Sequence, residues 1–332
     1  MQRRTFIKTT GAAGGIGLLG ITGAAQEDFP DESLTWMIPW AEGGGTDQFA
    51  RQFAPVMEDP LEQSIEIDNR PGAGSLLGSE WLHEQDPDGL TFGTVNSPAW
   101  EFNWLVQEID DWHVSDFEPI SFIGVFGYTI IVNDDYEIDS FEDLRDAYAD
   151  GEMDNFAFQG VGTDTHMISF LLRDDFGLEW DNIVPFDGGG PVNEAVISGE
   201  VPAGIATNTS AAAAEESDRV SAVVNLMDID ITDAFPDIDE ITEYGESLAF
   251  ITEFRQTQVA PPDTPEDVRD VIGEAAGEAA ESDAVAEWAE ETGNIIEFGD
   301  RDEATEILDG AVDELEERVD FDDFRRTVEE EA

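Results

Sequence analysis

The sequence of 332 residues lacks cysteine altogether and contains a single lysine, Lys8. Without cysteine there can be no disulfide bond, no thiolate metal site and no lipid-modified cysteine anchor. Basic side chains are scarce as well, because 14 lysines and arginines stand against 78 aspartates and glutamates, for a formal net charge of −64. This charge excludes sequence-independent binding to nucleic-acid phosphates and attachment to a membrane through a polybasic patch.

Common catalytic and metal-binding motifs are also missing. No stretch matches G-x-S-x-G or H-E-x-x-H, and GGGTDQ at residues 43–48 lacks the lysine of a complete P-loop. His83, His113 and His166 have no metal-ligand spacing, and acid pairs such as Asp134-Asp135 arise by chance in so acidic a chain. We therefore predict no catalytic residues, no bound metal and no cofactor.

Apolar residues, by contrast, are plentiful. Hydrophobic residues make up 41% of the chain, with 21 phenylalanines and 8 tryptophans, which is enough for a folded core and argues against disorder. A folded protein with so many carboxylates and almost no lysine is typical of strong brine, where salt screens self-repulsion. The composition predicts a halophilic protein, and a haloarchaeal source.

The amino-terminal segment resembles a twin-arginine export signal. Arg3 and Arg4 precede Phe6, Ile7 and Lys8, and a weakly apolar, glycine-rich run follows that is too short for an ordinary membrane-spanning helix. We predict a signal peptide over residues 1–26. The alternative is a disordered basic tail, which would have the same positive charge. The mature protein would be extracytoplasmic, either on the cell surface or secreted, and the signal could be cleaved or kept as an anchor.

Beyond the signal, short apolar strands alternate with amphipathic helices, which is the pattern of an α/β fold. The first strand is predicted at residues 34–38 and the first helix at 47–57. Two apolar stretches, near Phe122–Val132 and Leu248–Val259, predict strands that cross between lobes. They divide the chain into a first lobe of residues 28–125 and 253–332 and a second lobe of residues 126–252.

A glycine-rich turn between the first strand and helix predicts an anion site. The backbone N–H groups of Gly43, Gly44 and Gly45 can approach a ligand without hindrance from side chains, and the next helix directs its positive end there. Two later strands, near residues 155–158 and 183–186, also run into polar, glycine-bearing turns. Ligands of α/β proteins bind where parallel strands end in this way.

Several segments together resemble the receptors of tripartite tricarboxylate transporters, also called the Bug family of periplasmic binding proteins. The matching segments are IPWAEGGGTDQFAR (38–51), NRPGAGSLLGSEWL (69–82), DPDGLTFGTVN (86–96), GVGTDTHM (160–167), VPFDGGGPVNEAVISGEV (184–201) and VAPPDTPEDV (259–268). In order and spacing they cover nearly all of the mature chain. The resemblance implies a two-lobed, periplasmic-binding-protein-like (Venus flytrap) α/β fold that closes around a carboxylate.

Carried over by position, the resemblance also implies the ligand-binding residues. In the first lobe these are Trp40, Ala41, Gly43, Gly44, Gly45, Thr46 and Asp47 of the first loop, with Asn96 and Ser97 at the rim. In the second lobe they are Gln159, Gly162, Thr163, Thr165, His166, Phe186, Gly188 and Gly189, with Asn208 at the rim. Gly43 to Thr46 would donate hydrogen bonds to one carboxylate.

Some of these positions depart from the family or allow a structural role. Phe158 and Gln159 replace two small serine-like residues, and Asp187 replaces a common lysine. Asp47 is expected to cap the helix after Thr46, and Arg70 to serve as a turn residue. His166 could contact the ligand or be a buried, hydrogen-bonded histidine.

The predicted function is that of an extracytoplasmic solute-binding protein, not an enzyme. It would capture a mono-, di- or tricarboxylate and deliver it to polytopic permease subunits. One alternative is a secreted halophilic hydrolase with a carboxylate-lined cleft, for which two carboxylates would suffice, although so acidic a sequence singles out no pair. The other alternative is a cell-surface structural or adhesion protein.

Overall fold

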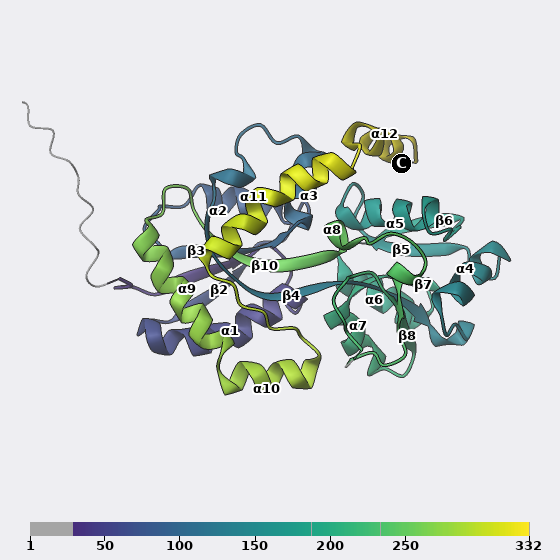
Figure 1. The fold of residues 1–332 in the computed structure, drawn as a ribbon, viewed down its shortest axis with the longest axis horizontal. Coiled ribbons are helices and arrows are strands. Elements are labelled where there is room, and N and C mark those ends of the chain that lie inside the picture. The colour runs from purple at the N-terminus through teal and green to yellow at the C-terminus, as the bar shows by residue number, and fades with distance from the viewer. Residues whose placement is uncertain (1–28, 187, 233, 332) are drawn as a thin grey trace, which may run out of the picture.

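The computed structural model describes residues 29–331 apart from residues 187 and 233. The predicted signal peptide and the departure at Asp187 lie outside the described residues. Within the described chain, strands and helices alternate in an α/β fold of two lobes that lie side by side (Figure 1). No helix in this part of the chain is both long and apolar enough to cross a bilayer.

The first lobe is built on a sheet with the strand order β2, β1, β3, β10, β4. Strand β1 (Leu34–Ile38), where the sequence predicts a strand, pairs in parallel with β2 (Ile65–Asn69) and β3 (Thr91–Ser97). Strand β10 (Glu253–Ala260) runs antiparallel to β3 and to the first part of β4 (Glu118–Asn133). The carboxyl ends of the three parallel strands therefore share one edge.

The second lobe continues the sheet from β4 through β7 (Ala203–Thr207), β5 (Asn155–Gln159) and β6 (Asn182–Phe186). Strand β5 is parallel to both of its neighbours, so these three strands also end at one edge. Strand β8 (Val220–Asn225) pairs with β4 and with the short β9 (Asp239–Glu240).

The long strand β4 joins the two lobes. Its residues up to Gly127 pair with β10, and its residues from Tyr128 onward pair with β7 and β8, so strand pairing is continuous through β4. The second predicted crossing begins as a short helix, α8 (Ala249–Thr252), because the buried Leu248 and Ile251 pack there before β10 starts. The lobe boundaries by residue number stay a prediction. They fall beside the point where β4 changes its pairing partners and beside the point where α8 ends and β10 begins.

The remaining helices cover both faces of the sheet. They are α1 (Gly45–Leu61), α2 (Leu76–His83), α3 (Ala99–Gln107), α4 (Phe141–Ala149), α5 (Asp164–Asp174), α6 (Gly189–Ser198), α7 (Asn208–Glu215), α9 (Glu266–Ala280), α10 (Asp283–Thr292), α11 (Arg301–Arg318) and α12 (Phe321–Glu331). In Figure 1, α1, α6, α7 and α10 lie below the strands, and α3, α5, α11 and α12 lie above them.

Helix α1 is longer than the predicted span of residues 47–57. It begins at Gly45, because Gly44 adopts the extended backbone of an N-cap, and it continues through Pro55 to Leu61. Phe49, Phe53 and Leu61 are buried on one face at a helical spacing, so packing stabilises the helix past the proline.

The carboxyl-terminal helix α12 contacts both lobes. The ring centroids of Phe321 and Phe324 lie 5.4 and 5.5 Å from that of Phe102 in α3. Phe324 also lies 6.0 Å from Phe170 in α5 of the second lobe. The end of the chain is therefore packed over the junction of the lobes.

Candidate functional site

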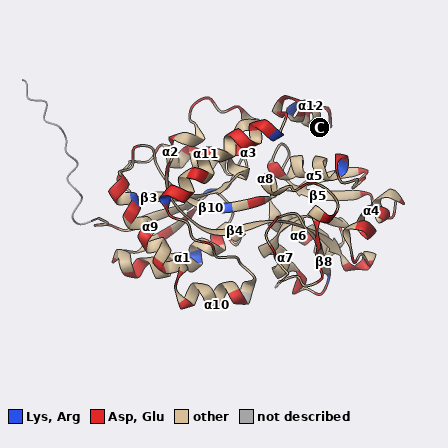
Figure 2. Cartoon of the chain, viewed as in Figure 1, with Lys and Arg blue, Asp and Glu red and all other residues tan. Residues whose placement is uncertain are grey.

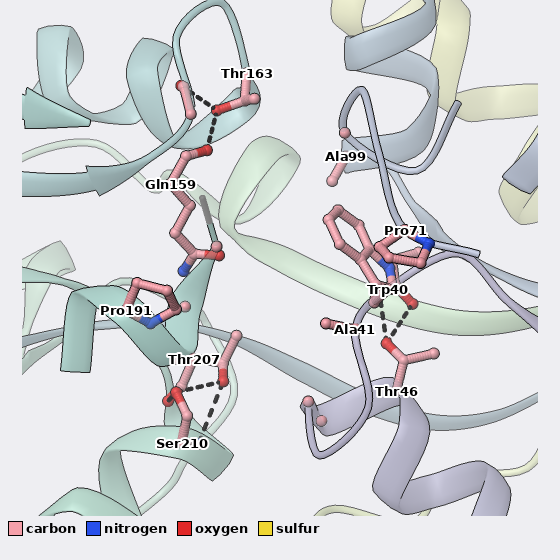
Figure 3. A pocket seen from close by; sticks show the side chains of 18 of the residues that line it. Trp40, Ala41, Thr46, Pro71, Ala99, Gln159, Thr163, Pro191, Thr207 and Ser210 are labelled. Carbon is pink, nitrogen blue, oxygen red and sulfur yellow. Dashed lines mark hydrogen bonds between the residues drawn. The ribbon is translucent and has the colours of Figure 1, made fainter. Parts of the chain in front are cut away.

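Between the lobes lies a cavity of about 890 Å³. Its walls are the loops that follow the parallel strands of both sheets, as expected for an α/β protein. In Figure 3, Trp40 and Thr46 of the first lobe face Gln159 and Pro191 of the second lobe.

Six helices begin at this cavity. Residues at or just before their first turns line it: Gly44 and Gly45 (α1), Gly74 (α2), Ala99 (α3), Thr163 and Asp164 (α5), Gly188 and Gly189 (α6), and Thr207 (α7). The first N–H groups of a helix have no partner within the helix, and the helix dipole makes that end positive. Such an arrangement attracts an anion without any basic side chain.

The first-lobe loop is held by Asp47. The Asp47 carboxylate accepts hydrogen bonds from the Gly43 N–H and Arg51 Nε, both at 2.8 Å, and from Asn69 Nδ2 at 3.0 Å. Burial alone would raise the pKa of Asp47, but hydrogen bonds from Arg51, Gly43 and Asn69 outweigh burial and leave this pKa below its ordinary value. The prediction that Asp47 is the N-cap was wrong, because Gly44 is the N-cap and Asp47 lies inside the first turn.

These bonds change which donors remain for a ligand. The N–H of Gly43 is occupied by Asp47, and the N–H of Gly44 points to the Ala41 carbonyl at 3.3 Å. The first-turn N–H groups of Gly45 and Thr46 have no partner in the described hydrogen bonds, and both residues line the cavity. Their neighbour Asn96 donates from Nδ2 to Thr46 Oγ1 at 3.0 Å and so fixes the hydroxyl.

Across the cleft, the start of α7 meets the start of α1. A methyl group added to Gly45 would lie only 3.0 Å from Thr209 Oγ1. Thr207 Oγ1 caps α7 by accepting from the Ser210 N–H at 3.3 Å. The starts of α1 and α7, one from each lobe, therefore lie close together at the same end of the cavity, and we refer to this pair of helix starts as the clamp.

In the turn before α5, side chains accept hydrogen bonds from the backbone of the same turn. Thr165 Oγ1 accepts from the Gln159 N–H and His166 Nδ1 accepts from the Gly162 N–H, both at 3.0 Å. These two side chains shape the turn and do not line the cavity.

His166 is the buried, hydrogen-bonded histidine of the two alternatives. Its ring lies 4.6 Å from the rings of both Phe158 and Phe170, inside the second-lobe core. Burial, with a smaller effect of the Arg173 charge, lowers the pKa of His166 to about 4, so the ring is neutral near pH 7. Phe158 is 1% exposed and faces the same core, so its bulk does not enter the cavity.

Most of the residues predicted for ligand binding line the cavity. They are Trp40, Ala41, Gly43, Gly44, Gly45, Thr46, Asn96, Gln159, Thr163, Phe186, Gly188 and Gly189. Their contact with a ligand stays a prediction.

The other predicted residues do not line it: Asp47, Ser97, Gly162, Thr165, His166 and Asn208. Ser97 is adjacent to Asn96 in β3, and neighbouring strand residues face opposite sides of a sheet. Asn208 turns toward the junction of the lobes, where its Oδ1 accepts from the Gly127 N–H at 3.1 Å. Arg70 also lies outside the lining and pairs with Asp68 at 2.8 Å, in keeping with its predicted structural role.

Sequence reasoning missed several other lining residues. They are Gln48, Pro71, Gly72, Ala73, Gly74, Ala99, Asn103, Gln107, Phe126, Tyr128, Gly160, Val161, Asp164, Pro191, Asn193, Ile197, Thr207, Ser210, Ala213, Ala214 and Phe254. Glu42 and Gly190 also line the cavity, and they lie inside the predicted glycine loops of the first and second lobe. Pro71 to Gly74 and Asp164 belong to motifs already singled out, and could have been included. Phe126, Tyr128 and Phe254 lie in the two strands at the lobe junction and have no local signal of a site.

The charges of the cavity are unusual for an anion site. Among the described lining residues there is no lysine, arginine or histidine, whereas Glu42 and Asp164 are acids. Tyr128 donates its hydroxyl to Asp164 Oδ2 at 2.9 Å. Burial raises the pKa of Asp164 to about 6, so its carboxyl is mainly ionised near pH 7. The described residues include no cluster of acids and histidines that could hold a metal ion.

A family model and curated relatives both match most of this chain. A family model described as the tripartite tricarboxylate transporter family receptor matches residues 49–312. A protein from the TAR-I ttuE-ttuC' intergenic region of Agrobacterium vitis is 28% identical, over 82% of this chain and 78% of that protein. Protein BugT of Bordetella pertussis is 25% identical, over 85% of this chain and 84% of its own length.

Solved structures share the fold. MatC from Rhodopseudomonas palustris with bound malate is 22% identical with a TM-score of 0.75, covering 90% of this chain and 100% of that one. R. palustris Rpa4515 with adipate is 21% identical with a TM-score of 0.78, covering 90% of this chain and 98% of that one.

Proposed function

The chain belongs to the tripartite tricarboxylate transporter receptor family, and from this premise we propose that it captures a carboxylate outside the cytoplasm for the permease subunits of such a transporter. The observation that carries the proposal is the convergence of six helix starts on one cavity whose described lining has no basic side chain. A carboxylate suits these backbone donors and needs no lysine.

The clamp between α1 and α7 explains why binding would couple to closure of the lobes. A carboxylate has two oxygens that each accept more than one hydrogen bond. One oxygen can take the N–H groups of Gly45 and Thr46, while the other takes donors at the start of α7 near Thr209. Donors from both lobes are satisfied only when the lobes are close together, so the ligand favours the closed form. That structural relatives hold malate and adipate supports the same ligand class.

The test is a thermal-shift screen of carboxylates in concentrated salt, because a ligand that binds only the folded state raises its melting temperature. We expect at least one carboxylate to stabilise the wild-type protein. In Gly45→Val the new side chain would occupy the clamp beside Thr209, so the shift should disappear while the protein stays folded.

Gly310→Val is the matched control, since a Cβ atom added at Gly310 of α11 meets no atom within 4 Å beyond the neighbouring backbone of its own helix. This variant should keep the ligand response. Unchanged affinity in a folded Gly45→Val protein would refute the clamp. If no carboxylate of the screen stabilised the wild type, the receptor proposal itself would fail.

Export is part of the proposed function. Arg3 and Arg4 support a twin-arginine signal, and the acid-rich composition supports a halophilic and haloarchaeal origin. Replacing both arginines with lysine should retain folded receptor in the cytoplasm, which cell fractionation would detect. Normal export of that variant would contradict the twin-arginine route.

A further inference from the structure

The two ends of the cavity differ in the hydrogen-bonding groups that they offer. The lower end in Figure 3, near Thr46, Thr207 and Ser210, lies at the starts of α1 and α7. The upper end, near Ala99 and Thr163, lies at the starts of α3 and α5. The lower end presents free backbone N–H groups, as described above, and is therefore a donor end.

At the upper end, the side-chain donor groups of Asn103, Gln107 and Thr163 each already make one hydrogen bond within the protein, so that only a second N–H of the Asn103 and Gln107 amides is left. Asn103 Nδ2 donates to the Gly74 carbonyl at 3.0 Å, and Gln107 Nε2 points to the Ala73 carbonyl at 3.4 Å. Thr163 Oγ1 donates to the carbonyl of Gln159 at 2.8 Å.

Two backbone N–H groups at the turn into α5 also have partners within the protein. The Asp164 N–H points to Asn103 Oδ1 at 3.3 Å, and the Gly162 N–H donates to His166 Nδ1. The positive end of α5 also already carries a carboxylate of its own, Asp164, which is 3% exposed and lines the cavity. At this end the start of α5 therefore presents acceptors and a carboxylate, and fewer of its donors are free than at the lower end.

A second carboxylate on the ligand would meet both obstacles at the upper end. It would have to approach the Asp164 carboxylate, and like charges in a partly dry site repel strongly. It would also find few donors to replace its lost water, and an unpaired buried charge is costly. An ammonium or hydroxyl group at the same place would instead donate to Asp164.

We propose that this receptor selects ligands with one carboxylate at one end and a hydrogen-bond-donating group, such as an ammonium, at the other, and that Asp164 excludes a second carboxylate. The inference rests on the proposed function, because it takes the donor end between α1 and α7 as the carboxylate clamp. It adds a specificity-determining residue and a narrower ligand class.

The experiment compares pairs of ligands that have the same chain length and differ only at the far end. The pairs are 4-aminobutanoate and succinate, 5-aminopentanoate and glutarate, and 6-aminohexanoate and adipate. Dissociation constants are measured by calorimetry near neutral pH in roughly 3 M KCl, where the Debye length is below about 3 Å. At the length that binds best, we expect the amino acid to bind at least about tenfold more tightly than the diacid, which is about 1.4 kcal/mol.

The variant Asp164→Asn keeps the shape of the side chain but removes its charge and adds a donor. We expect the ratio of the two affinities to fall by about tenfold or to reverse. Asp175→Asn is the control, since Asp175 is exposed at the other end of the same helix and should leave the ratio unchanged. A merely structural role of Asp164 would weaken both ligands of a pair equally.

The wild-type comparison needs no variant, so the proposal stays testable even if Asp164→Asn does not fold. If the wild type binds a diacid as tightly as its paired amino acid, the inference is overturned while the receptor function stands. If a ratio that favours the amino acid persists unchanged in a folded Asp164→Asn protein, Asp164 does not set it. If no ligand of the series or of the wider carboxylate screen binds, both the inference and the proposed function fail.

Discussion

Two aspartates in the first turns of helices beside the cavity have opposite surroundings. Asp47 accepts hydrogen bonds from Arg51, Asn69 and the Gly43 N–H, and its pKa lies below the ordinary value. Asp164 has no basic partner in the described hydrogen bonds, and burial raises its pKa to about 6. The first carboxylate stabilises the loop, whereas the second leaves negative charge in the wall of the cavity.

Glu101 in α3 gives a prediction about pH. It is fully buried, and burial raises the pKa of its carboxyl to about 7, so the folded state keeps a proton that the unfolded chain releases above about pH 4.5. The contribution of Glu101 to stability should therefore fall as pH rises from about 4.5 to about 7. Glu101→Gln should be more stable than wild type at pH 8, by on the order of 2 kcal/mol, and equal to it near pH 4.

Chemical unfolding at several pH values, with the difference between variant and wild type as the readout, measures this effect. Glu80→Gln removes the same charge from an exposed position of α2 and serves as the control. A difference between Glu101→Gln and wild type that does not change with pH would contradict the assignment.

Some secondary-structure elements of this fold build the cavity, and others stabilise the contact between the lobes. The strands bring their carboxyl ends to one cleft, and the helices that follow supply backbone donors there. Helix α12 has another role, because it forms no part of the cavity lining and instead covers the junction of the lobes. Phe324 on this helix is 3% exposed and packs between α3 and α5.

Shortening Phe324 to alanine should therefore destabilise the protein through the lost contacts with Phe102 and Phe170. For a buried phenylalanine we expect about 3 kcal/mol, measured by chemical or thermal unfolding in concentrated salt. Glu329→Ala, on the exposed side of α12, should stay within about 0.5 kcal/mol of wild type. If Phe324→Ala is as stable as that control, α12 does not help to hold the junction.

For the whole molecule, the large negative net charge is the property that most affects folding. Figure 2 shows aspartates and glutamates over the helices of both lobes and few basic residues between them. Several arginines pair with acids, as Arg269 does with Glu118 at 2.9 Å, but the chain has far too few to balance a formal charge of −64. Repulsion among the remaining carboxylates opposes folding unless salt screens it.

The protein should accordingly unfold or expand as salt is removed. The Debye length grows from about 3 Å at 1 M to about 10 Å at 0.1 M, so each carboxylate then interacts with many more neighbours. Circular dichroism across a salt series measures the transition, and a bound carboxylate should move it to lower salt. Folding that is unchanged down to about 0.1 M salt would contradict the halophilic interpretation.

The sequence by itself determined the class of the fold and the place of the glycine-rich loop that lines the cavity. Alternating apolar segments and glycine-bearing turns are local patterns, so β1, β4 and the loop at Gly43 to Gly45 could be predicted from them. Most of the residues that the family motifs predicted for ligand binding also line the cavity, although many other lining residues were not predicted. Helix α1 was placed correctly but ended too early, since the contacts that carry it past Pro55 are tertiary.

Only the tertiary structure decided which side chains face the cavity. His166 and Thr165 carry the right chemistry in the right motif, yet they bond to the turn itself because the second-lobe core covers them. Ser97 is the next residue after Asn96, yet the two side chains point to opposite faces of the sheet. The acceptor end around Asp164 arises because α3, α5 and β4 meet there, and residues so distant in sequence share no local pattern that could reveal their contact.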